Sequence, residues 1–139
     1  MPSGGAIINL SSSGTKTQQQ YPAYICSKLG LEGITVSTAK TLAAKGITIN
    51  TVSPGYTECD LLNWAGEKWL SIAKEASPLK RIGKIDIKLW RAFRSELTNF
   101  GAGKPSDIAN LIVFLSNPEK GGWIVGKNIG SDGGLVINN

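Results

Sequence analysis

Two short apolar runs with a helix-like segment between them constrain this chain more than any other feature of its sequence. Residues 6–11, AIINLS, and residues 47–53, ITINTVS, are rich in β-branched side chains, so each is predicted to be a buried strand. Residues 22–45 mix apolar with small side chains, begin with a proline and are followed by Gly46, as helices often are. Because a strand, a helix and a strand at this spacing form a right-handed crossover, the sheet is predicted to be parallel.

The remaining segments extend this pattern towards the carboxyl end. Residues 12–20, SSGTKTQQQ, have the composition of a loop. Residues 60–76 and residues 105–117 are predicted to be helices, and residues 123–134, WIVGKNIGSDGG, a last strand followed by a glycine turn. No long repeat, low-complexity tract or linker interrupts the chain, so we expect one α/β domain over residues 1–139.

The composition is typical of a globular domain and excludes several kinds of site. With 139 residues, of which 41% are hydrophobic and 18% charged, the chain is long enough to form a core. It contains no histidine, which excludes Ser-His-Asp and Cys-His catalysis and the usual zinc sites, so we expect no metal. The net charge of +5 comes from scattered lysines and arginines rather than from a basic run with aromatics, so nucleic acid is not an expected partner.

The cysteines and the longest apolar runs bear on where the protein resides. Cys26 and Cys59 are too few for a disulfide framework, and residues 1–10 lack the basic flank and long apolar stretch of a signal peptide. No apolar run approaches the roughly 20 residues that a membrane-spanning helix needs. We therefore expect a cytoplasmic protein with no membrane segment.

A tyrosine and a lysine on the first predicted helix could form a proton-transfer pair. Tyr24 and Lys28 are four residues apart and so share one helix face, where an ammonium group favours the phenolate and lowers the pKa of a phenol. Ser11, Ser12 and Ser13 end the preceding strand, where a parallel sheet presents its ligands. The spacing alone is weak evidence, since such pairs often occur by chance and serines often merely end a strand. The pair and the serines together indicate a site.

These motifs together resemble the carboxyl-terminal half of a short-chain dehydrogenase/reductase, the family of oxidoreductases that includes the 3-oxoacyl-acyl-carrier-protein reductases. The resemblance runs nearly end to end and rests on four segments in the family's order: GGAIINLSS, YPAYICSK, GITINTVSPGYTECD and GKNIGSDGG. It implies the carboxyl-terminal part of a Rossmann-like, doubly wound parallel sheet, with about three strands and flanking helices. The amino-terminal dinucleotide-binding half, with its glycine-rich turn, is expected to be missing from this chain.

The resemblance also implies a role for each residue of the constellation. Tyr24 would be the general acid in carbonyl reduction and the general base in alcohol oxidation, and Lys28 would lower its pKa and hold the nicotinamide ribose. Ser12 matches the substrate-orienting serine by its distance from the strand, whereas counting back from Tyr24 fits Ser11 almost as well; we prefer Ser12. The implied cofactor is NADP or NAD, with a slight preference for NADP, and the implied substrate is a small carbonyl compound or secondary alcohol.

The turn after the second strand resembles the family's cofactor turn but departs from it. Pro54 and Gly55 match the turn whose backbone approaches the nicotinamide and the phosphates. Thr57 replaces an aliphatic residue that contacts the carboxamide, and Cys59 replaces a threonine that bonds the cofactor. Because a thiol is a weaker donor than a hydroxyl, impaired cofactor binding is expected, and we interpret Cys59 as an inert substitution rather than a reactive thiol. Residues 61–77 correspond to a lid over the substrate, or they simply pack.

Residues 85–104 are interpreted as an insertion within the domain. Deleting them restores PLKRIGKPSDIANLIVFL, the continuous segment that the family usually shows. If they form a helix, one face would carry Leu89, Trp90, Phe93, Leu97 and Phe100. That face could bind a partner or a membrane surface, or it could pack on its own domain.

A second hypothesis is that the chain is a non-catalytic remnant of the family, acting as an interaction module. Residues 6–11 would present an unpaired strand edge, a template for association, so we expect a homo-oligomer or aggregation.

Overall fold

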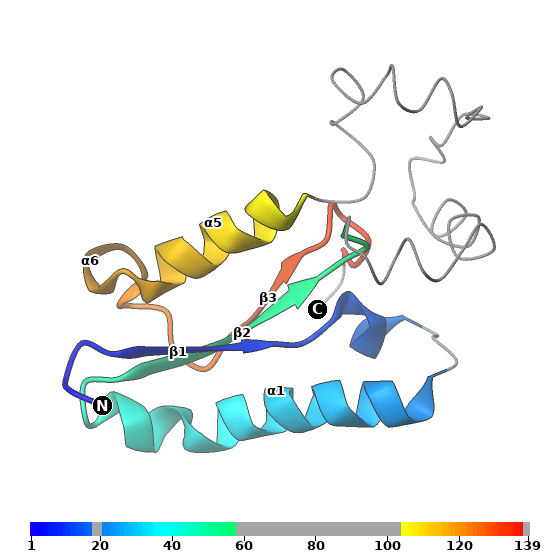
Figure 1. The fold of residues 1–139 in the computed structure, drawn as a ribbon. Coiled ribbons are helices and arrows are strands. Elements are labelled where there is room, and N and C mark those ends of the chain that lie inside the picture. Colours follow the sequence, from blue (N-terminus) through cyan, green and yellow to red (C-terminus); the bar gives the residue numbers. More distant parts are fainter. Residues whose placement is uncertain (18–20, 58–103, 138–139) are drawn as a thin grey trace.

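The architecture is a three-stranded parallel sheet covered by helices on both faces (Figure 1). This computed structural model describes residues 1–17, 21–57 and 104–137. The described elements are β1 (Ala6–Leu10), η1 (Ser13–Lys16), α1 (Pro22–Ala43), β2 (Thr48–Pro54), α5 (Pro105–Ser116), α6 (Pro118–Gly121) and β3 (Asn128–Ser131). The strands lie in the order β1-β2-β3, with α1 against one face and α5 and α6 on the other. The predicted α/β fold with about three parallel strands is confirmed.

Strands β1 and β2 are joined by α1, as the sequence pattern predicts. The two strands pair in parallel from Ala6 opposite Thr48 to Leu10 opposite Val52. Helix α1 begins at Pro22, where the missing amide N–H has no helical partner to lose. After α1 the chain turns at Gly46, whose φ of 69° lies in the left-handed region that glycine tolerates best. The predicted proline start and glycine stop are both confirmed.

The core differs in character between the two faces of the sheet. Beneath α5 it is apolar, with Val52, Ile108 and Leu115 buried together. Beneath α1 the apolar Ala39 and Ile49 are buried together with a polar pair: the Thr35 hydroxyl lies 2.7 Å from the Thr51 hydroxyl on β2. These groups can be buried at little cost because they are hydrogen-bonded to one another.

Two short helical segments were not predicted. The segment predicted as a loop after β1 contains the 3-10 turn η1, because the Ser12 side chain accepts a hydrogen bond from the Gly14 amide and caps it. Helix α6 begins after Asn117, whose side chain accepts from the amides of Glu119 and Lys120. The helix predicted at residues 60–76 lies outside the described residues.

Candidate active site

The carboxyl ends of the strands gather the candidate site residues at one edge of the sheet. Strand β1 ends at Leu10 and leads into η1, β2 ends at Pro54, and β3 ends at Ser131. The amino end of α1 lies at this same edge, next to η1 (Figure 1). Parallel strands place their carboxyl ends together, which explains why segments far apart in the sequence meet here.

Tyr24 and Lys28 are brought together on α1, as their spacing predicts. The Lys28 Nζ atom lies 5.6 Å from the centroid of the Tyr24 ring. The same ammonium group donates a hydrogen bond of 3.0 Å to the carbonyl oxygen of Leu10, which anchors it at the end of β1. Tyr24 is 43% exposed, and its hydroxyl makes no hydrogen bond with the described residues. A phenol that is open to a ligand therefore stands beside a fixed cation.

The three serines after β1 have different surroundings. The buried Ser11 hydroxyl donates to Glu32 Oε1 at 2.5 Å, and the buried Ser13 hydroxyl lies 3.0 Å from Asp132 Oδ2. Ser12 is half-buried, and its oxygen accepts from the Gly14 amide at 3.0 Å. Within the described residues the Ser12 hydroxyl donates no hydrogen bond, so its proton can be donated to a ligand. No hydrogen bond joins Ser12 to the lysine or the tyrosine within the described part of the chain.

The turn after β2 is packed tightly against the end of β3. The Gly55 amide donates to the carbonyl oxygen of Ser131 at 3.1 Å, and Pro54 lies opposite Ser131 in the sheet. A Cβ atom on Gly55 would lie 2.8 Å from both Cα and Cβ of Asp132, so the position requires glycine. The Thr57 hydroxyl donates to the Gly55 carbonyl oxygen at 3.1 Å, within its own turn. Cys59 lies outside the described residues.

Two acidic residues that the sequence analysis did not single out hold this edge together. Glu32 accepts hydrogen bonds from Ser11 and Thr15, and Asp132 accepts from Ser13 and from two backbone amides after β3. Two signals were available in the sequence. Glu32 follows Lys28 by four residues on the same helix face, and Asp132 directly precedes a glycine pair.

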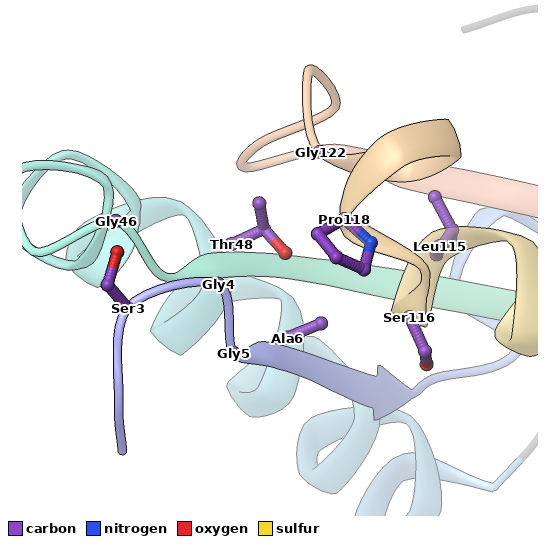
Figure 2. Close-up of a pocket in the computed structure, with 10 residues that line it drawn as sticks. All are labelled: Ser3, Gly4, Gly5, Ala6, Gly46, Thr48, Leu115, Ser116, Pro118 and Gly122. Carbon is purple, nitrogen blue, oxygen red and sulfur yellow. The ribbon is translucent and has the colours of Figure 1, made fainter.

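A small pocket lies at the opposite edge of the sheet, away from these residues. It has a volume of about 210 Å³ and opens at the amino ends of β1 and β2 (Figure 2). Its lining includes Gly4, Gly46, Thr48, Leu115 and Pro118. None of the candidate site residues contributes to it.

Metal binding and membrane insertion were tested over the same described ranges. Residues 1–17, 21–57 and 104–137 contain no group of three or more cysteine, aspartate or glutamate side chains that could hold a metal ion. No helix within these ranges is both long and apolar enough to cross a membrane.

Comparison with known proteins identifies relatives along nearly the whole chain. Residues 1–93 match the family model described as Enoyl-(Acyl carrier protein) reductase. The chain is 33% identical over 134 residues to the 3-oxoacyl-(acyl-carrier-protein) reductase FabG of Staphylococcus epidermidis, covering 96% of this chain and 46% of the relative. It is 33% identical over 132 residues to the acetoacetyl-CoA reductase of Cupriavidus necator, covering 94% and 45%. The chain thus spans about half the length of the curated relatives it matches.

Solved structures are also similar to nearly the whole of this chain, over about half of their own length. The angucycline C-6 ketoreductase LanV with bound NADP is similar with a TM-score of 0.77 and 27% identity, over 99% of this chain and 46% of that one. A blue fluorescent protein from a metagenomic library, in complex with NADPH, is similar with a TM-score of 0.75 and 29% identity, over 98% and 47%. By sequence and by fold, the chain belongs to the short-chain dehydrogenase/reductase family.

Proposed function

We propose that this chain is the carboxyl-terminal part of an NADP(H)- or NAD(H)-dependent oxidoreductase that interconverts a carbonyl group and a secondary alcohol. The observation that carries the proposal is the position of the Lys28 ammonium group, 5.6 Å from the Tyr24 ring and bonded to the end of β1. Ser12 follows two residues after that bonded carbonyl. The Tyr24 phenol, the Lys28 ammonium group and the Ser12 hydroxyl therefore belong to the carboxyl end of β1.

Each residue has a chemical task in this proposal. The Tyr24 hydroxyl gives its proton to the substrate's carbonyl oxygen in reduction and takes it back in oxidation. The positive charge of Lys28 stabilises the phenolate that forms. The Ser12 hydroxyl donates a hydrogen bond to the same substrate oxygen and so fixes its position.

The described residues fit the nicotinamide end of the proposed cofactor. The exposed Tyr24 hydroxyl is free of bonds to the described residues, and Lys28 uses one of its three N–H groups on Leu10, which leaves donors for a ribose. Gly55 keeps the turn of β2 free of a side chain at this edge. A nicotinamide, when bound, supplies or accepts the hydride. NADP is favoured because two similar solved structures contain NADP or NADPH.

We infer weak cofactor binding at this corner because Thr57 stands where the family carries an aliphatic residue that contacts the carboxamide; its hydroxyl bonds the Gly55 carbonyl oxygen within its own turn. The role of Cys59 stays a prediction, since it lies outside the described residues. We also propose that residues 1–139 form one partial domain of the family and that residues 85–104 are an insertion within it. Of that segment the structure describes Lys104 alone, where it caps α5.

A non-catalytic interaction module is the second candidate, favoured by the open edge of β1. Within the described residues β1 pairs with β2 and has no strand on its other side. Such an edge offers unpaired backbone N–H and C=O groups to another chain. We expect the 139-residue chain by itself to form a homo-oligomer through this edge.

The test is cofactor binding and turnover. The 139-residue chain is titrated with NADPH and NADH, alone and mixed with the amino-terminal half of the S. epidermidis relative, and NADPH oxidation is then followed with acetoacetyl-CoA. We expect binding in the mixture. Binding in neither setting would leave the interaction module as the function of this chain.

The role of Tyr24 is tested by Tyr24→Phe. The matched control is Tyr21→Phe, at the residue that precedes α1. Tyr24→Phe is expected to abolish turnover while cofactor binding persists, because the ring stays and only the proton donor is lost. Tyr21→Phe is expected to retain the rate. Equal rates for the two variants would overturn the assignment.

A further inference from the structure

We propose that Glu32 is a positioning residue that holds the turn carrying Ser12 in place for the reaction, an inference that rests on the proposed function. The Glu32 carboxylate accepts two hydrogen bonds and has no role in the proposed reaction. Glu32 is half-buried on α1, one helical turn after Lys28. It faces the segment between β1 and η1.

One carboxylate oxygen of Glu32 binds the turn at two points. Oε1 accepts from the Ser11 hydroxyl at 2.5 Å and from the Thr15 hydroxyl at 2.9 Å. Hydrogen bonds to a charged acceptor are shorter and stronger than neutral ones. The two donors lie on either side of Ser12 in the sequence, so Glu32 clamps the segment that contains it.

The clamp also reaches the backbone of Ser12. The Thr15 hydroxyl lies 2.9 Å from the Ser12 carbonyl oxygen as well as from Glu32, and the Thr15 amide donates to that carbonyl at 3.1 Å. The Gly14 amide donates to Ser12 Oγ. Moving Thr15 would therefore move both the main chain and the side chain of Ser12.

Lys28 and Glu32, on one face of α1, bind different parts of the segment that follows β1. Lys28 fixes the carbonyl oxygen of Leu10, and Glu32 fixes the two hydroxyls that follow. The structure records no ion pair between Lys28 and Glu32 among the residues it describes, so Glu32 acts as an acceptor of hydroxyl protons rather than as a counter-ion. An uncharged acceptor of the same shape should then restore part of the effect.

The experiment compares Glu32→Ala with Glu32→Gln in the full 139-residue chain by amide hydrogen exchange. Glu32→Ala is expected to accelerate exchange at Gly14 and Thr15 by about tenfold, the effect of losing one good hydrogen bond. The Thr51 amide, bonded to the Lys127 carbonyl oxygen within the sheet, is the internal reference and should not change. Glu32→Gln keeps an acceptor oxygen and loses only the charge, so it should accelerate exchange at Gly14 and Thr15 less than Glu32→Ala does.

Two outcomes overturn the proposal: unchanged exchange at Gly14 and Thr15 in Glu32→Ala, or no rescue by Glu32→Gln. If Glu32→Ala accelerates exchange everywhere, the double variant Ser11→Ala, Thr15→Val decides, because it removes the two donors and keeps the carboxylate. Acceleration confined to the turn supports the clamp, and uniform acceleration refutes it.

Turnover provides the second readout. In the mixture that turns over acetoacetyl-CoA, Glu32→Ala should lower kcat by about tenfold while the KM for NADPH stays within about twofold, since the turn orients the substrate and not the cofactor. An unchanged kcat would refute the positioning role. If the unsubstituted mixture shows no turnover, the proposed function is refuted. The hydrogen bonds of Glu32 to the turn are still tested, because the exchange experiment does not need turnover.

Discussion

Replacing Thr35 with valine should test whether a buried polar cluster fixes α1 on the sheet. The Thr35 hydroxyl, on a residue that is 1% exposed, donates to the Leu31 carbonyl oxygen at 2.9 Å and accepts from Asn9 Nδ2 at 2.8 Å. It also lies 2.7 Å from the Thr51 hydroxyl, which can donate to it. Thr35→Val preserves the volume of the side chain but leaves the donors of Asn9 and Thr51 without their acceptor.

The expected loss of stability follows from those two donors. Leaving a buried donor unsatisfied costs about 1 to 3 kcal/mol, and Asn9 is half-buried and can turn to water, so we expect a total near 2 to 3 kcal/mol. For a chain of this length each kcal/mol corresponds to roughly 3 to 5 °C in the melting temperature, which should fall by roughly 6 to 15 °C.

The assay is thermal and urea unfolding followed by circular dichroism, with a double-mutant cycle as the control. Thr51→Val should cost about 1 kcal/mol, because Thr35 keeps its other two partners. The double variant should be less destabilised than the sum of the single variants, by about 1 kcal/mol. A melting temperature of Thr35→Val that matches the unsubstituted chain, or strict additivity, would refute the reasoning.

Three further predictions concern the site and the sheet edge. Gly55→Ala should destabilise the chain by about 1 to 3 kcal/mol by urea unfolding, because the new methyl group overlaps Asp132; a neutral effect would show that the turn relaxes. In the reconstituted mixture, Ser12→Ala should lower kcat more than Ser11→Ala lowers it, since the Ser11 proton is already used on Glu32; the reverse order would reassign the serine. Sedimentation at micromolar concentration should show dimers or larger species joined at the β1 edge, and a cooperative monomer would contradict the proposed association.

The three strands and the long helices α1 and α5 were predictable because each follows a local rule. The apolar run of β1, the proline at the start of α1 and the left-handed Gly46 depend on residues close in sequence. The neighbourhood of Tyr24 and Lys28 was predictable for the same reason, since four residues along a helix return to the same face.

What could not be predicted depends on partners far apart in the chain. Counting residues did not separate Ser11 from Ser12, and the difference between them comes from Glu32, which accepts a hydrogen bond from the Ser11 hydroxyl. Asn50 is a polar residue fully buried inside β2. It can be buried because its side chain donates to the Ile124 carbonyl oxygen and accepts from the Lys127 amide, more than seventy residues away.

The hydrogen bond from Lys28 to the Leu10 carbonyl oxygen makes the position of the ammonium group beside the Tyr24 ring depend on the alignment of β1 within the sheet. Successive residues of a strand face opposite sides, so a shift of β1 by one residue against β2 would exchange its two faces and offer the ammonium group a different oxygen. If the proposed function holds, substitutions in β1 that loosen this alignment should abolish turnover although Tyr24, Lys28 and Ser12 are all present, because the Lys28 ammonium group would move away from the Tyr24 ring.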